Sequence, residues 1–169
     1  TTGIDFPPAG PVKNGIDPLN TLYVCTLHGD VWQVSGVDGE LRDLTWKRFA
    51  TGLFQPLGLK IHHRDIYVLG RDQITRLKDR DGNGEADDYE CFTNLHETSV
   101  GGHDYVACLE VDTEGRFYFV HATQGAVRIS ADGQSLEILG TGLRNPNGMG
   151  LGPHDELTAS PQEGEWTPG

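Results

Sequence analysis

The sequence predicts an all-β chain that forms part of a β-propeller, and three observations support this. A strand–turn–strand unit recurs, and its tyrosines, Tyr23, Tyr67 and Tyr118, stand 44 and then 51 residues apart. The block Thr51–Leu59 returns as Thr141–Met149, 90 residues later. The chain also has 23 glycines and 9 prolines, many of them in short turn signals. A period of roughly 40–50 residues with about four strands per unit is typical of propeller blades.

The first twenty residues predict an irregular lead-in, because turn signals follow one another closely there. They include Phe6-Pro7-Pro8, Gly10-Pro11, Asn14-Gly15 and Asp17-Pro18. Regular structure is expected to begin at Leu22. The predicted organisation is therefore a lead-in over 1–20 and a partial propeller over 21–169.

The propeller units are predicted in order from short apolar runs separated by turns. The first unit has strands at 22–24, 31–34 and within 41–49; the second at 57–61, 66–68 and 74–77; the third at 107–111, 117–119, 127–129 and 135–139. Turns such as Asp38-Gly39 and Asp132-Gly133 stand where hairpins are needed. This amounts to about three blades plus part of a fourth, whereas a six-bladed parent needs on the order of 270 residues. We therefore expect further blades from the same parent chain or from another subunit.

The charge of the chain excludes two classes of partner. The formal net charge is −12 and the isoelectric point is about 4.8. Such a surface repels phosphate backbones and anionic lipid, so we expect no nucleic-acid partner. The longest apolar runs are a few residues long, so no membrane insertion is expected either.

The most informative stretch is Asp79–Glu90, which matches the calcium-loop pattern D-x-[DN]-x-[DN]-G-x5-E at every position. Oxygen ligands are predicted from Asp79, Asp81 and Asn83 at alternate positions, and Gly84 permits the sharp turn. The remaining predicted ligands are the Glu85 carbonyl, Asp87 and a bidentate Glu90. The sequence therefore predicts a calcium site, with a polar acidic hairpin loop as the alternative.

The flanks of this loop predict strands. Residues 73–77 and 89–93 are rich in β-branched and aromatic side chains and lack a helical period. We therefore expect a calcium loop between two strands rather than between two helices, with a structural ion rather than a sensor.

A family resemblance becomes visible at Gly142-Leu143-Arg144-Asn145-Pro146-Asn147-Gly148. This block resembles the G-[LF]-R-N-P-x-G stretch of soluble quinoprotein sugar dehydrogenases, which use pyrroloquinoline quinone (PQQ), and of L-sorbosone-dehydrogenase-like proteins. Most of the chain more closely resembles large propeller proteins of planctomycetes that are described as membrane-bound or haem-containing dehydrogenases, whose activity is poorly defined. The similar blocks are 10–19, 25–32, 52–59, 79–90, 142–150 and 164–168.

The quinoprotein resemblance implies roles for several residues. In those enzymes the Arg-Asn pair contacts the quinone, which implies that Arg144 and Asn145 bind the cofactor. A histidine next to a Gly-Gly pair acts there as the base. Here His103, followed by Asp104, comes after the glycines rather than before them. His103 and Asp104 are the candidate catalytic residues, with a loop histidine that has no chemical task as the alternative.

The stretch 160–166 falls where those enzymes place ligands for an active-site calcium, although it lacks their His-Gly-Pro motif. Glu163 is a candidate to bind a cation or a sugar hydroxyl. Trp166 is a candidate to stack on a sugar face, and ordinary packing is an equal alternative for it.

The resulting functional hypothesis is the calcium-binding propeller portion of a PQQ-dependent sugar or alcohol dehydrogenase, with calcium and PQQ as cofactors, located in the periplasm or secreted. Its partner would be a small sugar or alcohol. One alternative is a non-catalytic module that binds glycans or protein partners. A second alternative is a calcium-dependent lactonase-type hydrolase. It needs a cation held on the propeller axis by Asn and Glu side chains, whereas the calcium motif here is expected between outer strands, which counts against it.

Overall fold

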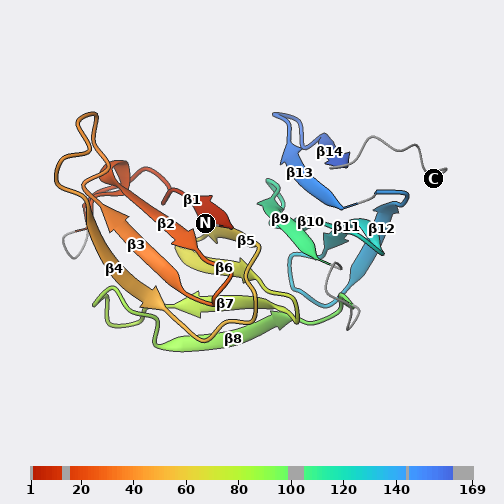
Figure 1. Ribbon diagram of the computed structural model, residues 1–169, viewed down its shortest axis with the longest axis horizontal. Coiled ribbons are helices and arrows are strands. Elements are labelled where there is room, and N and C mark those ends of the chain that lie inside the picture. The colour runs from red at the N-terminus through yellow and green to blue at the C-terminus, as the bar shows by residue number, and fades with distance from the viewer. Residues whose placement is uncertain (1, 13–15, 99–104, 144, 162–169) are drawn as a thin grey trace.

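The computed structural model describes residues 2–12, 16–98, 105–143 and 145–161, and nearly all of its regular structure is β-strand (Figure 1). Three antiparallel sheets have four strands each and a fourth has two. The strands of the first sheet are β1 (Gly3–Asp5), β2 (Thr21–Cys25), β3 (Val31–Ser35) and β4 (Thr45–Ala50). The second has β5 (Gly58–His62), β6 (Asp65–Leu69), β7 (Ile74–Lys78) and β8 (Asp88–Thr93). The third has β9 (Val106–Val111), β10 (Phe117–His121), β11 (Gly125–Ile129) and β12 (Leu136–Gly140), and the last has β13 (Pro146–Leu151) and β14 (Leu157–Pro161).

The sheets are arranged as successive propeller blades. Within each four-stranded sheet the strands pair in chain order. The first strands of the sheets, β1, β5, β9 and β13, also contact one another in that order. They form the inner edge of an arc, while β4, β8 and β12 form its outer edge (Figure 1). The prediction of an all-β propeller portion with three blades and part of a fourth is confirmed.

One part of the predicted lead-in is regular. Gly3–Asp5 forms β1 and pairs with β2, where Gly3 lies opposite Cys25 and Asp5 opposite Tyr23. A strand of three residues is too short to show an alternation of apolar and polar side chains, so the sequence does not reveal it. It forms because it pairs with β2. Later in the same stretch, Pro18–Asn20 forms a short 3-10 helix that Asp17 caps through the Leu19 amide. The first blade therefore takes its inner strand from the stretch that the sequence predicts to be irregular.

The core lies between neighbouring blades because successive side chains of a strand point to opposite faces. In β6, Ile66 and Val68 pack against the first blade, in a cluster with Tyr23 and Val31. Tyr67 and Leu69 of the same strand belong to a second cluster, shared with the third blade. The members of that cluster from the third blade include Val106, Leu109, Phe117, Phe119, Val127 and Ile129. Each central strand is thus buried on both faces.

The inner strands approach so closely that two of them need glycine. A Cβ on Gly58 would lie 2.9 Å from Cβ of Leu109 and 3.0 Å from its amide nitrogen. A Cβ on Gly3 would lie 2.7 Å from the amide nitrogen of Leu59. Real Cβ atoms do not tolerate such contacts with backbone, so these positions set the spacing of the first three blades.

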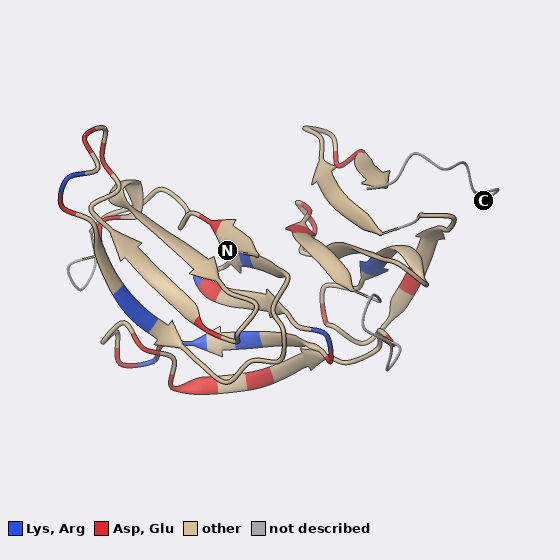
Figure 2. Cartoon of the chain, in the orientation of Figure 1, with Lys and Arg blue, Asp and Glu red and all other residues tan. Residues whose placement is uncertain are grey.

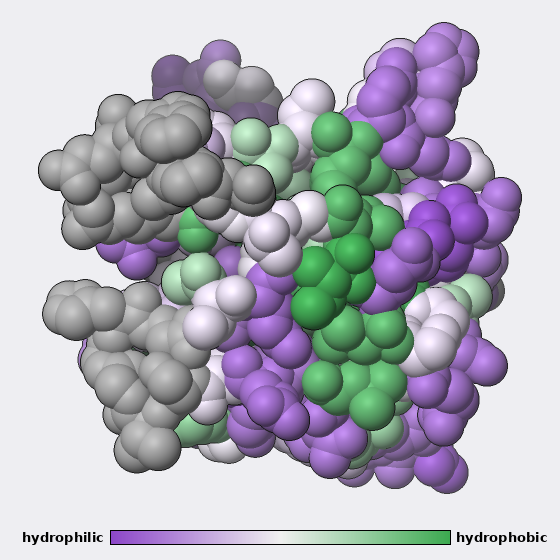
Figure 3. Space-filling model, turned by 90° about the vertical axis from the view of Figure 1, so that its right-hand side faces the viewer, coloured by the Kyte–Doolittle hydropathy of each residue, from purple (hydrophilic) through white to green (hydrophobic). Residues whose placement is uncertain are grey.

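An apolar strip crosses the side of the molecule on which the third and fourth sheets lie (Figure 3). The exposed large apolar residues of β12 are Ile138, 49% exposed, and Leu139, 39% exposed. In a propeller, a surface of this kind is covered by the next blade. We propose that further blades, from the same parent chain or from another subunit, cover this apolar surface. Among the described residues, no helix is long and apolar enough to cross a bilayer.

Candidate functional site

The acidic stretch forms a loop between two strands, as predicted. Residues 79–87 join β7 to β8, which pair antiparallel with Lys78 opposite Asp88. Acidic residues lie along this loop and on β8 (Figure 2). The hydrogen-bonded pairing of β7 with β8 holds both ends of the loop in place. The path of the loop between these ends depends on its turns.

The loop turns around the Asp79 carboxylate. Oδ1 of Asp79 accepts hydrogen bonds from the amides of Gly82 (2.7 Å) and Asn83 (3.2 Å), and Oδ2 accepts one from the amide of Gly84 (2.9 Å). Gly82 and Gly84 have φ of +73° and +82°, in the left-handed region that favours glycine. The glycine predicted for the sharp turn at position 84 is therefore required by the observed backbone.

Three predicted ligands converge. Asp79, Asp81 and Asp87 each place a carboxylate oxygen within 4.8 Å of the others. Asn83 lies beside them: its Nδ2 donates to Oδ2 of Asp81 at 3.0 Å, while its Oδ1, the predicted ligand atom, accepts from the Glu85 amide at 2.8 Å. Carboxylate oxygens gathered from a short loop are ligands that Ca²⁺ prefers. The residues present therefore fit a hard divalent cation, and such an ion would relieve the repulsion among the three carboxylates.

The side chains of Glu85 and Glu90 point away from the three carboxylates, while the predicted ligand at position 85 is the backbone carbonyl, whose role stays a prediction. The Glu85 side chain points to Lys47 of β4, with 3.6 Å between carboxylate oxygen and ammonium nitrogen. Glu90 lies within β8, opposite Arg76 in the ladder, and its carboxylate pairs with the Lys78 ammonium at 2.7 Å. Because β8 already begins at Asp88, the ladder and these cations fix the direction of Glu90. It is not part of the group formed by Asp79, Asp81 and Asp87, and its bidentate role stays a prediction.

The loop also contacts the first blade. The Ala86 amide donates to the Phe49 carbonyl at 2.8 Å, and the Lys47 ammonium donates to the Asn83 carbonyl. Tyr23 of the first blade lies near Asp79. Burial is the main reason that the Tyr23 pKa rises to about 12; Asp79 raises it further, while the Gln33 hydrogen bond lowers it. The loop therefore bridges the first two blades.

The residues implied by the quinoprotein resemblance lie mostly outside the described part of the chain. This applies to His103, Asp104, Arg144, Glu163 and Trp166, whose roles stay predictions.

Asn145 is described, and it has φ of +43°. It lines a cavity of about 240 Å³ together with Leu57, Tyr105, Ala107, Ala122, Pro146 and Asn147. Pockets for cofactors usually measure about 300–1,000 Å³. This cavity, as the described residues line it, is smaller than that range, and the role of Asn145 toward PQQ stays a prediction.

Two buried histidines lie between the second and third blades, and sequence reasoning did not single them out. His96 is buried, and its Nε2 bonds the Gly70 carbonyl at 3.2 Å. His121 is also buried, and its Nδ1 accepts from the amides of Thr123 and Gln124. Burial lowers the pKa of His96; the Gly70 bond opposes this, and nearby His121 lowers it further. The two histidines are 25 residues apart in the chain, so no sequence motif predicts that they are neighbours. Packing of the blades brings them together.

Comparison with known proteins identifies the fold. No family model and no curated protein matches the chain. A solved luciferin-regenerating enzyme aligns with a TM-score of 0.60 and 16% identity, covering 85% of this chain and 50% of that one. A gluconolactonase from Xanthomonas campestris aligns with a TM-score of 0.52 and 19% identity, covering 82% and 52% respectively. The chain thus spans about half the length of these relatives, and at such identities the likeness shows the fold alone.

Proposed function

We propose that this chain is the calcium-binding part of a β-propeller, in which the loop 79–87 holds a structural Ca²⁺. The convergence of Asp79, Asp81 and Asp87 in a loop with the calcium-binding pattern carries this proposal. A bound calcium ion would be coordinated by the oxygens of these carboxylates and would have a structural role. The periplasm or the cell exterior remains the proposed location. Extracellular calcium-binding modules have dissociation constants of about 10⁻⁴–10⁻³ M.

The role of the ion follows from the contacts of the loop. Asp79 lies at its start and Asp87 at its end, while Ala86 and Asn83 bond the first blade. An ion that draws the two ends together fixes the segment that contacts the first blade. Calcium is therefore proposed to stiffen the junction between the first and second blades.

Calorimetric titration of the chelator-treated chain with CaCl₂ tests this proposal. We expect one site per chain with a dissociation constant on the order of 10⁻⁵–10⁻³ M. Magnesium is expected to bind more weakly, because it demands a tighter octahedral shell. Absence of binding at millimolar calcium would overturn the proposal.

As a second candidate, we propose that the propeller to which this chain contributes is a lactonase-type hydrolase. The fold likeness to a gluconolactonase supports this candidate over a PQQ-dependent dehydrogenase. The dehydrogenase hypothesis depends on His103 and Arg144, which lie outside the described residues, and on Asn145, whose cavity is small. The non-catalytic glycan-binding alternative depends on Glu163 and Trp166, outside the described residues as well.

Two assays on the full-length protein separate these activities. Hydrolysis of glucono-1,5-lactone, followed by proton release in calcium buffer, is the expected result. The parallel assay adds PQQ, calcium, glucose and a redox dye. Dye reduction without lactone hydrolysis would reject the hydrolase and favour the dehydrogenase. If neither reaction occurs, binding to a glycan array would favour the non-catalytic module.

A further inference from the structure

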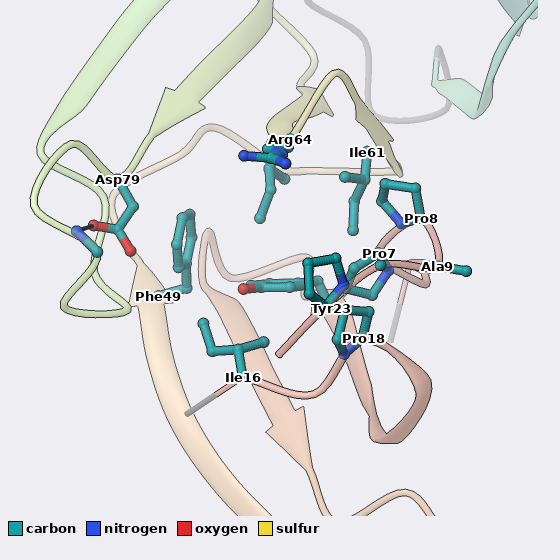
Figure 4. A pocket seen from close by; sticks show the side chains of 14 residues that line it. Pro7, Pro8, Ala9, Ile16, Pro18, Tyr23, Phe49, Ile61, Arg64 and Asp79 are labelled. Carbon is teal, nitrogen blue, oxygen red and sulfur yellow. Dashed lines mark hydrogen bonds between the residues drawn. The ribbon is translucent and has the colours of Figure 1, made fainter. Parts of the chain in front are cut away.

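A cavity of about 420 Å³ lies where the lead-in meets the first two blades (Figure 4). It is lined by Arg64 from the turn between β5 and β6 and by Asp79 and Gly82 from the loop between β7 and β8. Its walls are mainly apolar and come from elements distant in the sequence. They include Pro7, Pro18, Tyr23, Phe49, Ile61 and Ile66.

The size and walls of this cavity suit the body of a small apolar ligand. Its volume falls within the range of about 300–1,000 Å³ that is usual for small-molecule sites. Tyr23 and Phe49 pack edge to face, with ring centroids 5.3 Å apart and an interplanar angle of 83°. The Tyr23 hydroxyl is fixed by Gln33, whose Nε2 donates to it at 3.1 Å. Two buried and mutually supported rings form a firm wall for a flat hydrophobic group.

Among the described residues that line the cavity, Arg64 and Asp79 are charged. The Asp79 carboxylate is bonded by amides of its own loop. Arg64 is exposed and stands across the cavity from Ile16 and Pro18 (Figure 4). Within the described ranges, no acidic side chain pairs with it. The adjacent acid, Asp65, is paired with Arg76, whose Nε donates to it at 2.7 Å. Arg64 thus offers an uncompensated guanidinium fork beside an apolar cavity.

The backbone holds Arg64 in a conformation that its residue type disfavours. His63 and Arg64 form the two-residue turn between β5 and β6, with φ of +49° and +75°. Turns with positive φ at both positions favour Asn-Gly or Gly-Gly. Non-glycine residues in this region cost of order 1 kcal/mol each, and such strain gathers at functional positions. The turn holds Arg64 at the mouth of the cavity, where its side chain is one of the lining groups.

We propose that this cavity binds a small carboxylic acid with an apolar, ring-sized body. The carboxylate pairs with the Arg64 guanidinium, and the ring lies against Tyr23 and Phe49. This site shares Asp79 and Gly82 with the calcium loop as wall residues, but the proposed contacts to the ligand come from Arg64, Tyr23 and Phe49, so binding there does not require the ion. It goes beyond the proposed function, because neither hydrolysis nor calcium binding calls for an acid at this end of the sheets.

Calorimetric titration with 2-naphthoate and with the neutral 2-naphthamide tests the proposal. Wild type is expected to bind the acid more tightly than the amide. Arg64→Gln is expected to weaken binding of the acid about tenfold, the effect of losing one charged hydrogen bond, and to leave the amide unchanged. Arg42→Gln is the matched control, because Arg42 pairs with Glu40 on the surface and does not line the cavity. Its affinity for both probes should equal that of wild type.

A second variant separates binding from folding. Arg64→Gly should be at least as stable as wild type, because glycine adopts φ of +75° without strain, yet it should bind naphthoate as weakly as Arg64→Gln. The titrations are run with calcium and with chelator, and the effect of Arg64 is expected in both. Three results would overturn the proposal: no binding of naphthoate at millimolar concentration, equal affinity of wild type and both Arg64 variants, or equal affinity for acid and amide.

Discussion

Replacing Asp79 with asparagine is expected to abolish the stabilisation of the chain by calcium. Asp79 supplies one of the three converging carboxylates, and both of its oxygens accept amides of the loop. The amide of asparagine carries no charge and offers only one acceptor oxygen. For wild type at a calcium concentration 100 times the dissociation constant, bound calcium contributes about 2.7 kcal/mol. That corresponds to a rise in melting temperature of about 5–10 °C for a domain of this size.

Thermal unfolding with and without calcium measures this effect. The matched control is Asp38→Asn, because Oδ1 of Asp38 likewise accepts two amides of a turn, those of Glu40 and Leu41, but in a loop without the calcium pattern. The control should keep the full calcium-dependent rise. If Asp79→Asn keeps that rise too, the ion does not bind where the carboxylates converge.

Asp112→Ala is expected to destabilise the third blade by about 3 kcal/mol. The Asp112 carboxylate is fully buried. It accepts hydrogen bonds from the backbone amides of Glu114 (3.0 Å) and Arg116 (2.8 Å). It also accepts from Nε of Arg116 (2.6 Å) and from the Tyr118 hydroxyl (2.8 Å). Alanine would leave these donors without their acceptor beneath a tight turn. Denaturant unfolding measures the loss, and Asp132→Ala, in the exposed equivalent turn at Gly133, should cost less. Equal costs for the two variants would contradict the account.

The same carboxylate predicts a dependence on pH. Burial raises the Asp112 pKa, but hydrogen bonds from Arg116 and Tyr118 outweigh this and hold the pKa below its usual value. A lowered pKa in the folded state contributes stability above the unfolded pKa of about 3.9, and this contribution is lost as pH falls through the folded value. The difference in unfolding free energy between wild type and Asp112→Asn should therefore be constant from about pH 7 to 5 and shrink below about pH 4. A constant difference down to pH 2 would contradict this assignment.

The central strands could be predicted because they are buried between neighbouring blades. Residues such as Tyr67 and Tyr118 recur in equivalent central strands, so repeat and alternation point to the same elements. The strand at Gly3–Asp5 could not be predicted, because its three residues depend on pairing with β2. The local sequence pattern therefore predicts strands in which apolar and polar side chains alternate over several residues. The short strand Gly3–Asp5 forms only through its pairing with β2.

The acidic loop shows where a motif stops being informative. The turn around Asp79 and the glycine at 84 follow from residue types that allow few alternatives. The last position of the pattern depends on the element that comes after the loop. Here a strand begins at Asp88, and the ladder directs Glu90 toward Lys78. The cavity beside Arg64 was not predictable either, since its walls come from the lead-in and from two blades.

Anomalous diffraction from crystals of the chain grown with calcium tests whether the loop 79–87 holds the ion. We expect one strong anomalous peak among the Asp79, Asp81 and Asp87 carboxylates, at about 2.3–2.6 Å from their oxygens. A loop of the same conformation with no peak at that position, or with a peak elsewhere, would contradict it.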